Sequence, residues 1–275
     1  MNRLYSFRLL CVVLGLAFIA AGVPAQAQQE GGFQPTVGQP GKDVVWVPTQ
    51  QDLVEKMLDL AKVTPQDYVI DLGSGDGRTV ITAAQRGARA LGVEYNPDMV
   101  ELSKQNAIKA GMTEKATFVK ADIFETDFSQ ATVLTLFLLP NINIKLRPKI
   151  LAMKPGTRVV SNSFTMDDWE PEDTFRLETN CTSWCTAFLW IVPAKVEGKW
   201  NFPGGDVLTI DQKFQKISGF LVSGGKKTQF AGKVTGDKFN MVADQTEFTG
   251  GIQGDSLTLK SSLGDSIRKA TRAAQ

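Results

Sequence analysis

The segment best suited to binding a small ligand is the glycine-rich run Asp71-Leu72-Gly73-Ser74-Gly75-Asp76-Gly77. It follows the apolar run 68–72, a predicted buried strand, and precedes a helix predicted from Thr79, so it lies where a doubly wound sheet binds ligands. Arg78 replaces the third glycine of a dinucleotide loop, and a Walker loop's Gly-Lys-Ser/Thr ending is absent from the sequence. Asp71 would repel phosphate, so the loop favours a cationic amino-acid ligand.

Two further acids follow the next predicted strands. The run 90–94 ends in Glu94, and the run 116–122 ends in Asp122. Parallel strands of a doubly wound sheet present their carboxyl ends at the same edge, so we expect both acids beside the glycine loop. A glycine loop alone also closes ordinary strand-to-helix turns, but the two acids favour a ligand site.

With these features the sequence resembles the class I, seven-strand S-adenosylmethionine-dependent methyltransferases over about residues 45–192. The resemblance rests on the glycine loop, Glu94, Asp122, Leu138-Leu139-Pro140 and Lys154-Pro155-Gly156, in the family's order and spacing. In that family the second-strand acid binds the ribose hydroxyls and the third-strand acid faces the adenine amino group. The resemblance implies S-adenosyl-L-methionine as cofactor and no metal. The implied cofactor residues are Val47, Asp71, Gly73, Ser74, Gly75, Asp76, Gly77, Glu94, Tyr95, Asp122, Ile123 and Leu139.

A narrower set of segments is similar to small protein-lysine methyltransferases of prokaryotic and mitochondrial type. In these proteins the segment equivalent to residues 47–49 folds over the cofactor, and the family often has proline where this chain has Gln50. The resemblance implies in-line methyl transfer to a lysine side chain of a protein. The segments are Trp46-Val47-Pro48-Thr49, Gly75-Asp76-Gly77-Arg78, Leu146-Arg147-Pro148-Lys149 and the stretch from Val160-Ser161 to Trp169.

Candidate groups on the acceptor side are Thr49, Asn141 and Asn143, of which Thr49 and Asn141 are the predicted catalytic residues. For both asparagines we favour helix capping after Pro140 over catalysis. Arg78 could either pair with a neighbouring acid or act in the site. Three tryptophans are expected in the core or at an interface rather than in an acceptor cage: Trp169, Trp184 and Trp190.

The elements that would position these residues alternate between apolar strands and amphipathic helices across residues 43–194. This pattern predicts an α/β fold, a Rossmann-like doubly wound sheet of seven strands. Thr49 and Asp52 have the spacing of a capping box for the first helix. Asn96-Pro97-Asp98 should cap the helix after the second strand. Residues 175–179 and 187–192 are predicted to form a closing hairpin.

Helical periodicity disappears over residues 195–263. Five short strand-like runs, punctuated by Gly-Gly and Gly-Asp dipeptides, predict an antiparallel β domain folded as a small meander, barrel or sandwich. The domain holds no acid or cysteine cluster with catalytic spacing, so we expect a structural or partner-binding role, or a packing lid over the main sheet. Residues 264–275 are predicted to be a basic tail, helical or frayed.

The composition excludes several chemistries. The 275-residue chain contains no His, which rules out Ser-His-Asp, Cys-His and His-ligated zinc sites. Its 30 Lys+Arg against 29 Asp+Glu are not the charge pattern of a nucleic-acid binder. The length allows one large domain or two smaller ones.

The N-terminus is predicted to be a cleaved signal peptide, residues 1–27, followed by a flexible linker, residues 28–42. Arg3 and Arg8 precede an apolar run that is short for a membrane span, and Ala25-Gln26-Ala27 is a small-residue cleavage site. An uncleaved anchor is the alternative. Cleavage removes two Arg and leaves 28 basic against 29 acidic residues. We therefore expect an exported protein, periplasmic or secreted.

Export bears on Cys181 and Cys185, the two cysteines after the predicted cleavage site. Along an extended strand they would lie about 13 Å apart, so a disulfide needs a turn between them. A disulfide and two buried thiols both fit the sequence. Two thiolates are too few ligands for an ordinary zinc site.

A second hypothesis is an exported noncatalytic protein that keeps the fold and binds a partner through its β domain. Its basis is the compartment, since S-adenosylmethionine is a cytosolic metabolite. An NAD oxidoreductase is a distant third. The sequence leaves the oligomeric state open, and the intact loop favours the enzyme.

Overall fold

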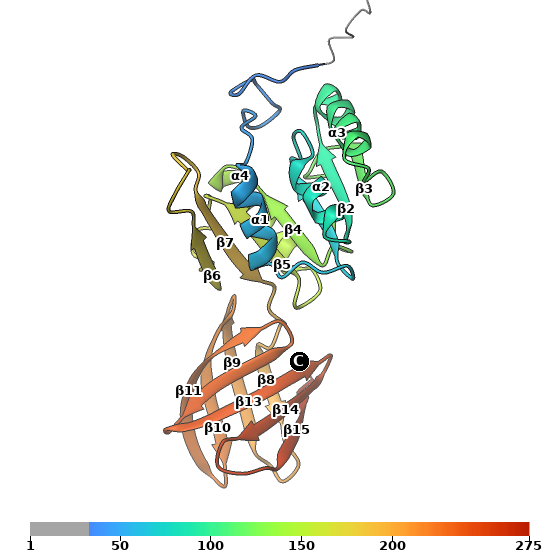
Figure 1. Ribbon diagram of the computed structural model, residues 1–275. Helices are drawn as coiled ribbons and strands as arrows, with labels where there is room; N and C mark the ends of the chain where they lie inside the picture. Colours follow the sequence, from blue (N-terminus) through green and yellow to red (C-terminus); the bar gives the residue numbers. More distant parts are fainter. Residues whose placement is uncertain (1–32, 275) are drawn as a thin grey trace, which may run out of the picture. The chain divides into compact units, whose positions relative to one another are not determined.

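The computed structural model describes residues 33–274 (Figure 1). The predicted signal peptide and the start of the predicted linker lie outside these residues. Among residues 33–274, no helix has both the length and the apolar character needed to cross a bilayer.

Residues 68–191 form a seven-strand sheet in the order β3-β2-β1-β4-β5-β7-β6 (Figure 1). The first five strands are parallel, and β6 and β7 form an antiparallel hairpin at the edge. The predicted α/β sheet is confirmed. The strands are β1 Tyr68–Leu72, β2 Arg89–Glu94, β3 Ala116–Lys120, β4 Val133–Leu136, β5 Arg158–Asn162, β6 Asp173–Arg176 and β7 Thr186–Ile191.

Four helices accompany this sheet: α1 Gln51–Leu60, α2 Arg78–Gln85, α3 Pro97–Lys109 and α4 Pro140–Leu151. Strand β1 shows why both faces of the sheet need cover, because successive side chains point to opposite faces. Val69 packs into one core with side chains of α1 and α2, whereas Ile70 and Leu72 pack into a second core with side chains of α4. The glycine loop therefore leaves a strand that is fixed on both faces.

The helix starts test two capping predictions. Asn96 caps α3 as predicted, accepting hydrogen bonds from the backbone N–H groups of Asp98 at 2.9 Å and Met99 at 3.4 Å. The capping box of α1 is wrong, because the N-cap is Gln50 and its side chain makes no capping bond. Thr49 instead accepts a hydrogen bond from Asn162 and is held toward β5.

Residues 198–272 form a closed antiparallel barrel of eight strands. The sequence analysis expected five strands and a separate tail from residue 264, and both expectations are wrong. Within the supposed tail, β15 pairs with β14 and β8 and so closes the barrel. It escaped prediction because Ala270 is the one fully buried side chain among four charged or polar neighbours. The strands are β8 Gly198–Asn201, β9 Val207–Lys213, β10 Lys216–Ser223, β11 Lys226–Thr235, β12 Lys238–Ala243, β13 Thr246–Gln253, β14 Ser256–Ser261 and β15 Ile267–Arg272.

The turn between β9 and β10 contacts the segment that follows β5. The Phe214 ring stacks on Trp169 with centroids 5.9 Å apart, and Gln215 donates a hydrogen bond to the Glu170 carbonyl at 2.7 Å. The Arg147 guanidinium also lies over the Phe214 ring, 5.1 Å from its centroid. These contacts give Trp169 the interface role that the sequence predicted for it.

Candidate functional site

The glycine loop between β1 and α2 depends on its glycines for both conformation and space. Gly73, Gly75 and Gly77 have φ values of +81°, +54° and +83°, a region that other residues rarely adopt. A Cβ on Gly75 would lie 2.7 Å from the indole nitrogen of Trp46. Ser103 of α3 donates a hydrogen bond to the Gly75 carbonyl at 2.8 Å. The loop is therefore held open as a surface of bare backbone.

The two predicted acids stand beside this loop. Glu94 accepts hydrogen bonds from the backbone N–H groups of Gly75 at 3.0 Å and Asn96 at 2.9 Å. Asp122 accepts one from the Phe124 N–H at 2.8 Å and forms an ion pair with Lys42. The hydrogen bond from Lys42 holds the pKa of Asp122 below its ordinary value, which favours the ionised carboxylate of Asp122.

The acids and the loop line one cavity of about 480 Å³. Three candidate site residues do not line it: Gly77, Asn141 and Asn143. Gly77 begins α2 and its Cβ would meet the Phe118 ring at 2.8 Å. The predicted residues that the cavity brings together are Val47, Thr49, Asp71, Gly73, Ser74, Gly75, Asp76, Glu94, Tyr95, Asp122, Ile123 and Leu139.

Several lining residues were not predicted from sequence, and Lys42 is one of them. The end of the predicted linker, residues 39–42, lines the cavity in a turn. The Trp46 N–H donates a hydrogen bond to the Gln39 carbonyl at 2.9 Å, and the Gly38 N–H donates one to the Trp46 carbonyl at 2.8 Å. Lys42 reaches Asp122 from this turn, and its ammonium lies 4.9 Å from the Tyr95 ring centroid. This segment is rich in Gly, Gln and Pro and has no hydrophobic periodicity, so the sequence does not indicate where it lies. Its position depends on contacts with distant residues, such as the Lys42–Asp122 ion pair.

Arg78 ties the segment before α1 to the glycine loop. Its Nε donates hydrogen bonds to both carboxylate oxygens of Asp76 at 3.0 and 3.1 Å, and its Nη1 donates to the Thr49 carbonyl at 2.7 Å. The pairing with a neighbouring acid is confirmed. It also fixes the backbone of Thr49 next to the loop, because a guanidinium can hold two partners in one plane.

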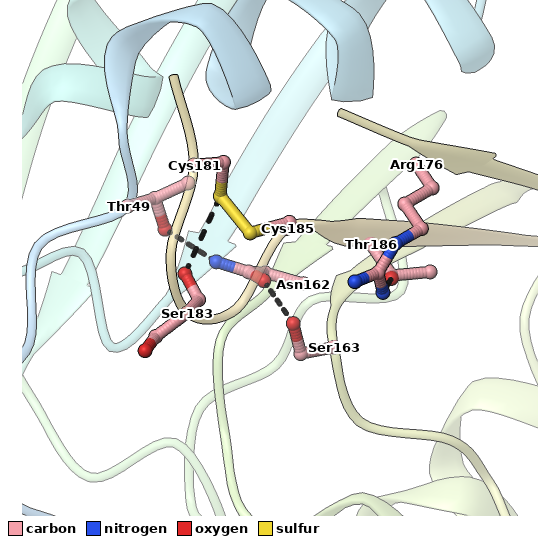
Figure 2. Close-up of a disulfide and its surroundings, with 8 residues drawn as sticks. All are labelled: Thr49, Asn162, Ser163, Arg176, Cys181, Ser183, Cys185 and Thr186. Carbon is pink, nitrogen blue, oxygen red and sulfur yellow. Dashed lines mark hydrogen bonds between the residues drawn. A yellow bond between two sulfur atoms is a disulfide. The ribbon is translucent and has the colours of Figure 1, made fainter. Parts of the chain in front are cut away.

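The Thr49 side chain is buried and fixed by β5. Asn162 donates a hydrogen bond to Thr49 Oγ1 at 3.2 Å, and Ser163 donates to Asn162 Oδ1 at 2.8 Å. Figure 2 shows this pair in the surroundings of the Cys181–Cys185 disulfide. The catalytic role of Thr49 stays a prediction, but Thr49 lines the cavity and the hydrogen bond from Asn162 fixes the orientation of its hydroxyl.

The two asparagines of α4 lie elsewhere. Asn141 is exposed in the first turn of α4, and the helix begins without a side-chain cap after Leu139. Asn143 is fully buried and donates hydrogen bonds to the carbonyls of Phe164 at 3.3 Å and Thr165 at 3.2 Å. The capping prediction is therefore wrong for both. Asn143 positions the loop after β5, whereas Asn141 lies outside the cavity lining and its catalytic role stays a prediction.

Two of the three tryptophan assignments agree with the structure, and one of the two alternatives for the cysteines is observed. Trp169 and Trp190 are buried, at 1% and 0% exposure, as expected. Trp184 is 45% exposed and lines the cavity, so its assignment to the core or an interface is wrong. The disulfide between Cys181 and Cys185 is present because residues 181–185 turn rather than extend. This turn carries Trp184 out of the core.

The cavity residues fit S-adenosyl-L-methionine. Gly73 and Gly75 provide a surface that a Cβ would fill, and buried Ser74 Oγ has no hydrogen-bond partner among the described residues. Glu94 and Asp122 offer acceptors for hydroxyl and amino groups, and Asp71 offers a negative charge toward a cation. Tyr95, 48% exposed, offers a flat apolar face.

Comparison with known proteins agrees with this chemistry. A protein-lysine N-methyltransferase of Saccharolobus islandicus is 43% identical over 152 residues, which cover 54% of this chain and 94% of that protein. The adenine nucleotide translocase lysine N-methyltransferase of Mus musculus is 37% identical over 120 residues, 43% of this chain. An RNA methyltransferase from Salinibacter ruber, solved with S-adenosyl-L-homocysteine, is 45% identical with a TM-score of 0.52. That match covers 55% of this chain and 96% of the solved one.

Fold and site together define a class I S-adenosylmethionine-dependent methyltransferase. The family model described as the ANTKMT methyltransferase domain matches residues 71–173. The chain belongs to the same family of S-adenosylmethionine-dependent methyltransferases as the Saccharolobus protein. It spans about half the length of the mouse relative.

Asp71 gives the site a pH dependence that can be measured. Burial raises the pKa of Asp71 to about 7, and the charges of Glu94 and Asp76 act in the same direction, against the hydrogen bond from Thr135. Because the folded pKa lies above the unfolded one, this group's contribution to stability falls as pH rises from about 4 to about 7. Burial favours the protonated form of Asp71, whereas a bound cationic ligand would favour the ionised carboxylate.

We therefore expect the affinity for S-adenosyl-L-methionine to rise with pH below about 7 and to level off above it. The rise has a limit of about tenfold per pH unit for one linked proton. Dissociation constants at pH 6, 7 and 8 measure it, and Asp71→Asn should flatten the part due to Asp71. Parallel curves for the two proteins would show that Asp71 does not respond to the cofactor.

Proposed function

We propose that this protein transfers the methyl group of S-adenosyl-L-methionine to lysine side chains of a protein substrate. The observation that carries the proposal is one cavity that joins the cofactor residues to Thr49 and to apolar side chains beyond them. The names of the Saccharolobus and mouse relatives support lysine as the acceptor. The intact glycine loop and acids favour this function over the noncatalytic alternative.

When bound, the cofactor supplies a methyl group on a sulfonium sulfur, from which the acceptor nitrogen takes it as the N–C bond forms and the S–C bond breaks. The chain's own contribution is alignment and exclusion of water. Thr49 Oγ1 is suited to accept an N–H of the amine, which would leave the nitrogen lone pair free. Asn162 and Arg78 hold Thr49 in place for this role.

The acceptor amine must be neutral to react. A lysine ammonium entering an apolar channel is poorly solvated, which lowers its pKa and favours loss of the proton to water. Phe137, Leu138 and Ile142 line the cavity and provide this environment. A chain without His can therefore work without a strong side-chain base.

The name of the Salinibacter neighbour makes RNA the acceptor to test against lysine. Total protein and total RNA from the source cells are incubated separately with the enzyme and methyl-labelled cofactor. The proposal predicts label in protein, recovered as methyl-lysine by mass spectrometry, and lost with Glu94→Ala. Label confined to RNA would overturn the lysine assignment and leave the methyltransferase class intact.

We also propose that the protein is exported after cleavage behind Ala27. The sequence of residues 1–27 and the disulfide support this, since disulfides persist in oxidising compartments. Mass spectrometry of the protein from fractionated cells tests the proposal. A periplasmic or secreted chain beginning at Gln28 is the expected result, and a cytosolic chain beginning at Met1 would contradict it.

A further inference from the structure

Trp184 has an unusual position for a large apolar side chain. It is 45% exposed, has a φ of +55°, and lines the same cavity as the cofactor residues. Bulky residues seldom adopt positive φ, so the surrounding structure must impose this conformation. Core packing does not explain this position, because a tryptophan that served only to fill the core would bury its ring.

Two phenylalanines extend the Trp184 ring into a wall. Phe137 meets Trp184 edge to face with centroids 6.1 Å apart, and Phe137 stacks on Phe164 at 6.0 Å. The three residues come from the segments after β4, after β5 and before β7, and all line the cavity. We call Phe137, Phe164 and Trp184 the aromatic wall.

The wall is held by contacts that the cofactor site does not use. The disulfide closes residues 181–185 into a short loop around Trp184, and Leu177 N–H donates to the Cys185 carbonyl at 2.9 Å. Asn143 donates to the carbonyl of Phe164. The Thr49–Asn162 pair lies in the surroundings of the same disulfide (Figure 2), and Thr49 lines the same cavity as the wall.

We propose that the aromatic wall binds the acceptor lysine side chain and that Trp184 determines how well it is bound. The inference rests on the proposed lysine methylation. Aromatic faces attract alkylammonium groups and pack against methylene chains, so a wall of three rings suits a lysine and its methylated products. The disulfide acts as a positioning element, because it fixes the loop that presents the indole.

Steady-state kinetics with poly-L-lysine as acceptor test the wall. We expect Trp184→Ala to raise KM roughly three- to thirtyfold with a smaller change in kcat, as for loss of a cation–π contact. Trp184→Phe should recover part of the loss. The Cys181→Ser/Cys185→Ser variant should shift KM in the same direction. Phe220→Ala is the matched control, because it removes an exposed ring of the barrel outside the cavity.

Two further readouts separate a local effect from misfolding. Cofactor affinity and thermal unfolding of Trp184→Ala should match the unaltered protein. In the complex with S-adenosyl-L-homocysteine, the ¹⁵N-indole signal of Trp184, assigned by its absence in Trp184→Phe, should shift on addition of Nα-acetyl-Nε-trimethyllysine amide. The other four tryptophan signals report whether the change is local.

The outcomes distinguish the wall from the proposed function. If poly-L-lysine is methylated and Trp184→Ala keeps the normal KM, the wall is overturned and the proposed function stands. If no lysine is methylated by the unaltered protein, the proposed function fails. In that case a shifted Trp184 signal would still support an alkylammonium site, and an unshifted signal would overturn the wall as well.

Discussion

Replacing Glu94 with alanine should reduce the affinity for S-adenosyl-L-methionine roughly 10- to 100-fold. The carboxylate stands at the end of β2 in the cavity, where the family places the ribose. A hydrogen bond to a charged group contributes about 1.5–3 kcal/mol, which corresponds to this change in affinity. Isothermal titration calorimetry of both proteins measures the difference.

The control for Glu94 is a second acid on the same domain. Glu101 is an exposed residue of α3 with a weak ion pair to Lys104 at 3.9 Å, so Glu101→Ala should leave the affinity unchanged. The cofactor affinity of Glu94→Gln should lie between those of the unaltered protein and Glu94→Ala, because the glutamine amide keeps one acceptor oxygen. Equal affinities for Glu94→Ala and Glu101→Ala would remove Glu94 from the binding site.

Gly75→Ala should weaken cofactor binding at least about tenfold and should also destabilise the fold. Its left-handed conformation costs an L-residue about 1–2 kcal/mol. In addition, the new methyl group would lie 2.7 Å from the Trp46 indole nitrogen and would cover backbone that faces the cavity. Calorimetric titration gives the affinity, and chemical unfolding gives the stability.

Gly111 provides a matched comparison for this strain. Its φ is +68°, but no heavy atom lies within 4 Å of the position of an added Cβ. Gly111→Ala should lose similar stability through strain while binding the cofactor normally. If the two variants bound the cofactor equally well, close approach to Gly75 would not be part of the site.

Local rules explain why the sequence could predict that the expected cofactor residues lie together in one cavity. Asp71 and Glu94 lie at the carboxyl ends of β1 and β2, and Asp122 follows β3 by two residues. The topology of a parallel sheet brings these strand ends together. The spacing of Gly73, Gly75 and Gly77 marked the loop between β1 and α2, whose backbone is not covered by side chains at these positions. The cap at Asn96 is similarly local, since it involves only residues 96–99.

The acceptor side could not be predicted in the same way, because contacts between distant residues build it. Thr49 was placed in a capping box by its spacing to Asp52, but a hydrogen bond from Asn162, 113 residues away, holds it instead. Trp184 was assigned to the core or an interface by residue type, but the disulfide loop turns it outward. Lys42 lies in a segment whose composition gave no sign of order.

Titration of the purified protein with S-adenosyl-L-methionine in a calorimeter tests the central claim, that this cavity binds the methyl donor. The account predicts one site per chain with micromolar affinity, lost or strongly weakened in Glu94→Ala. A folded protein that shows no binding heat at several temperatures, and no protection from thermal unfolding by the cofactor, would contradict it.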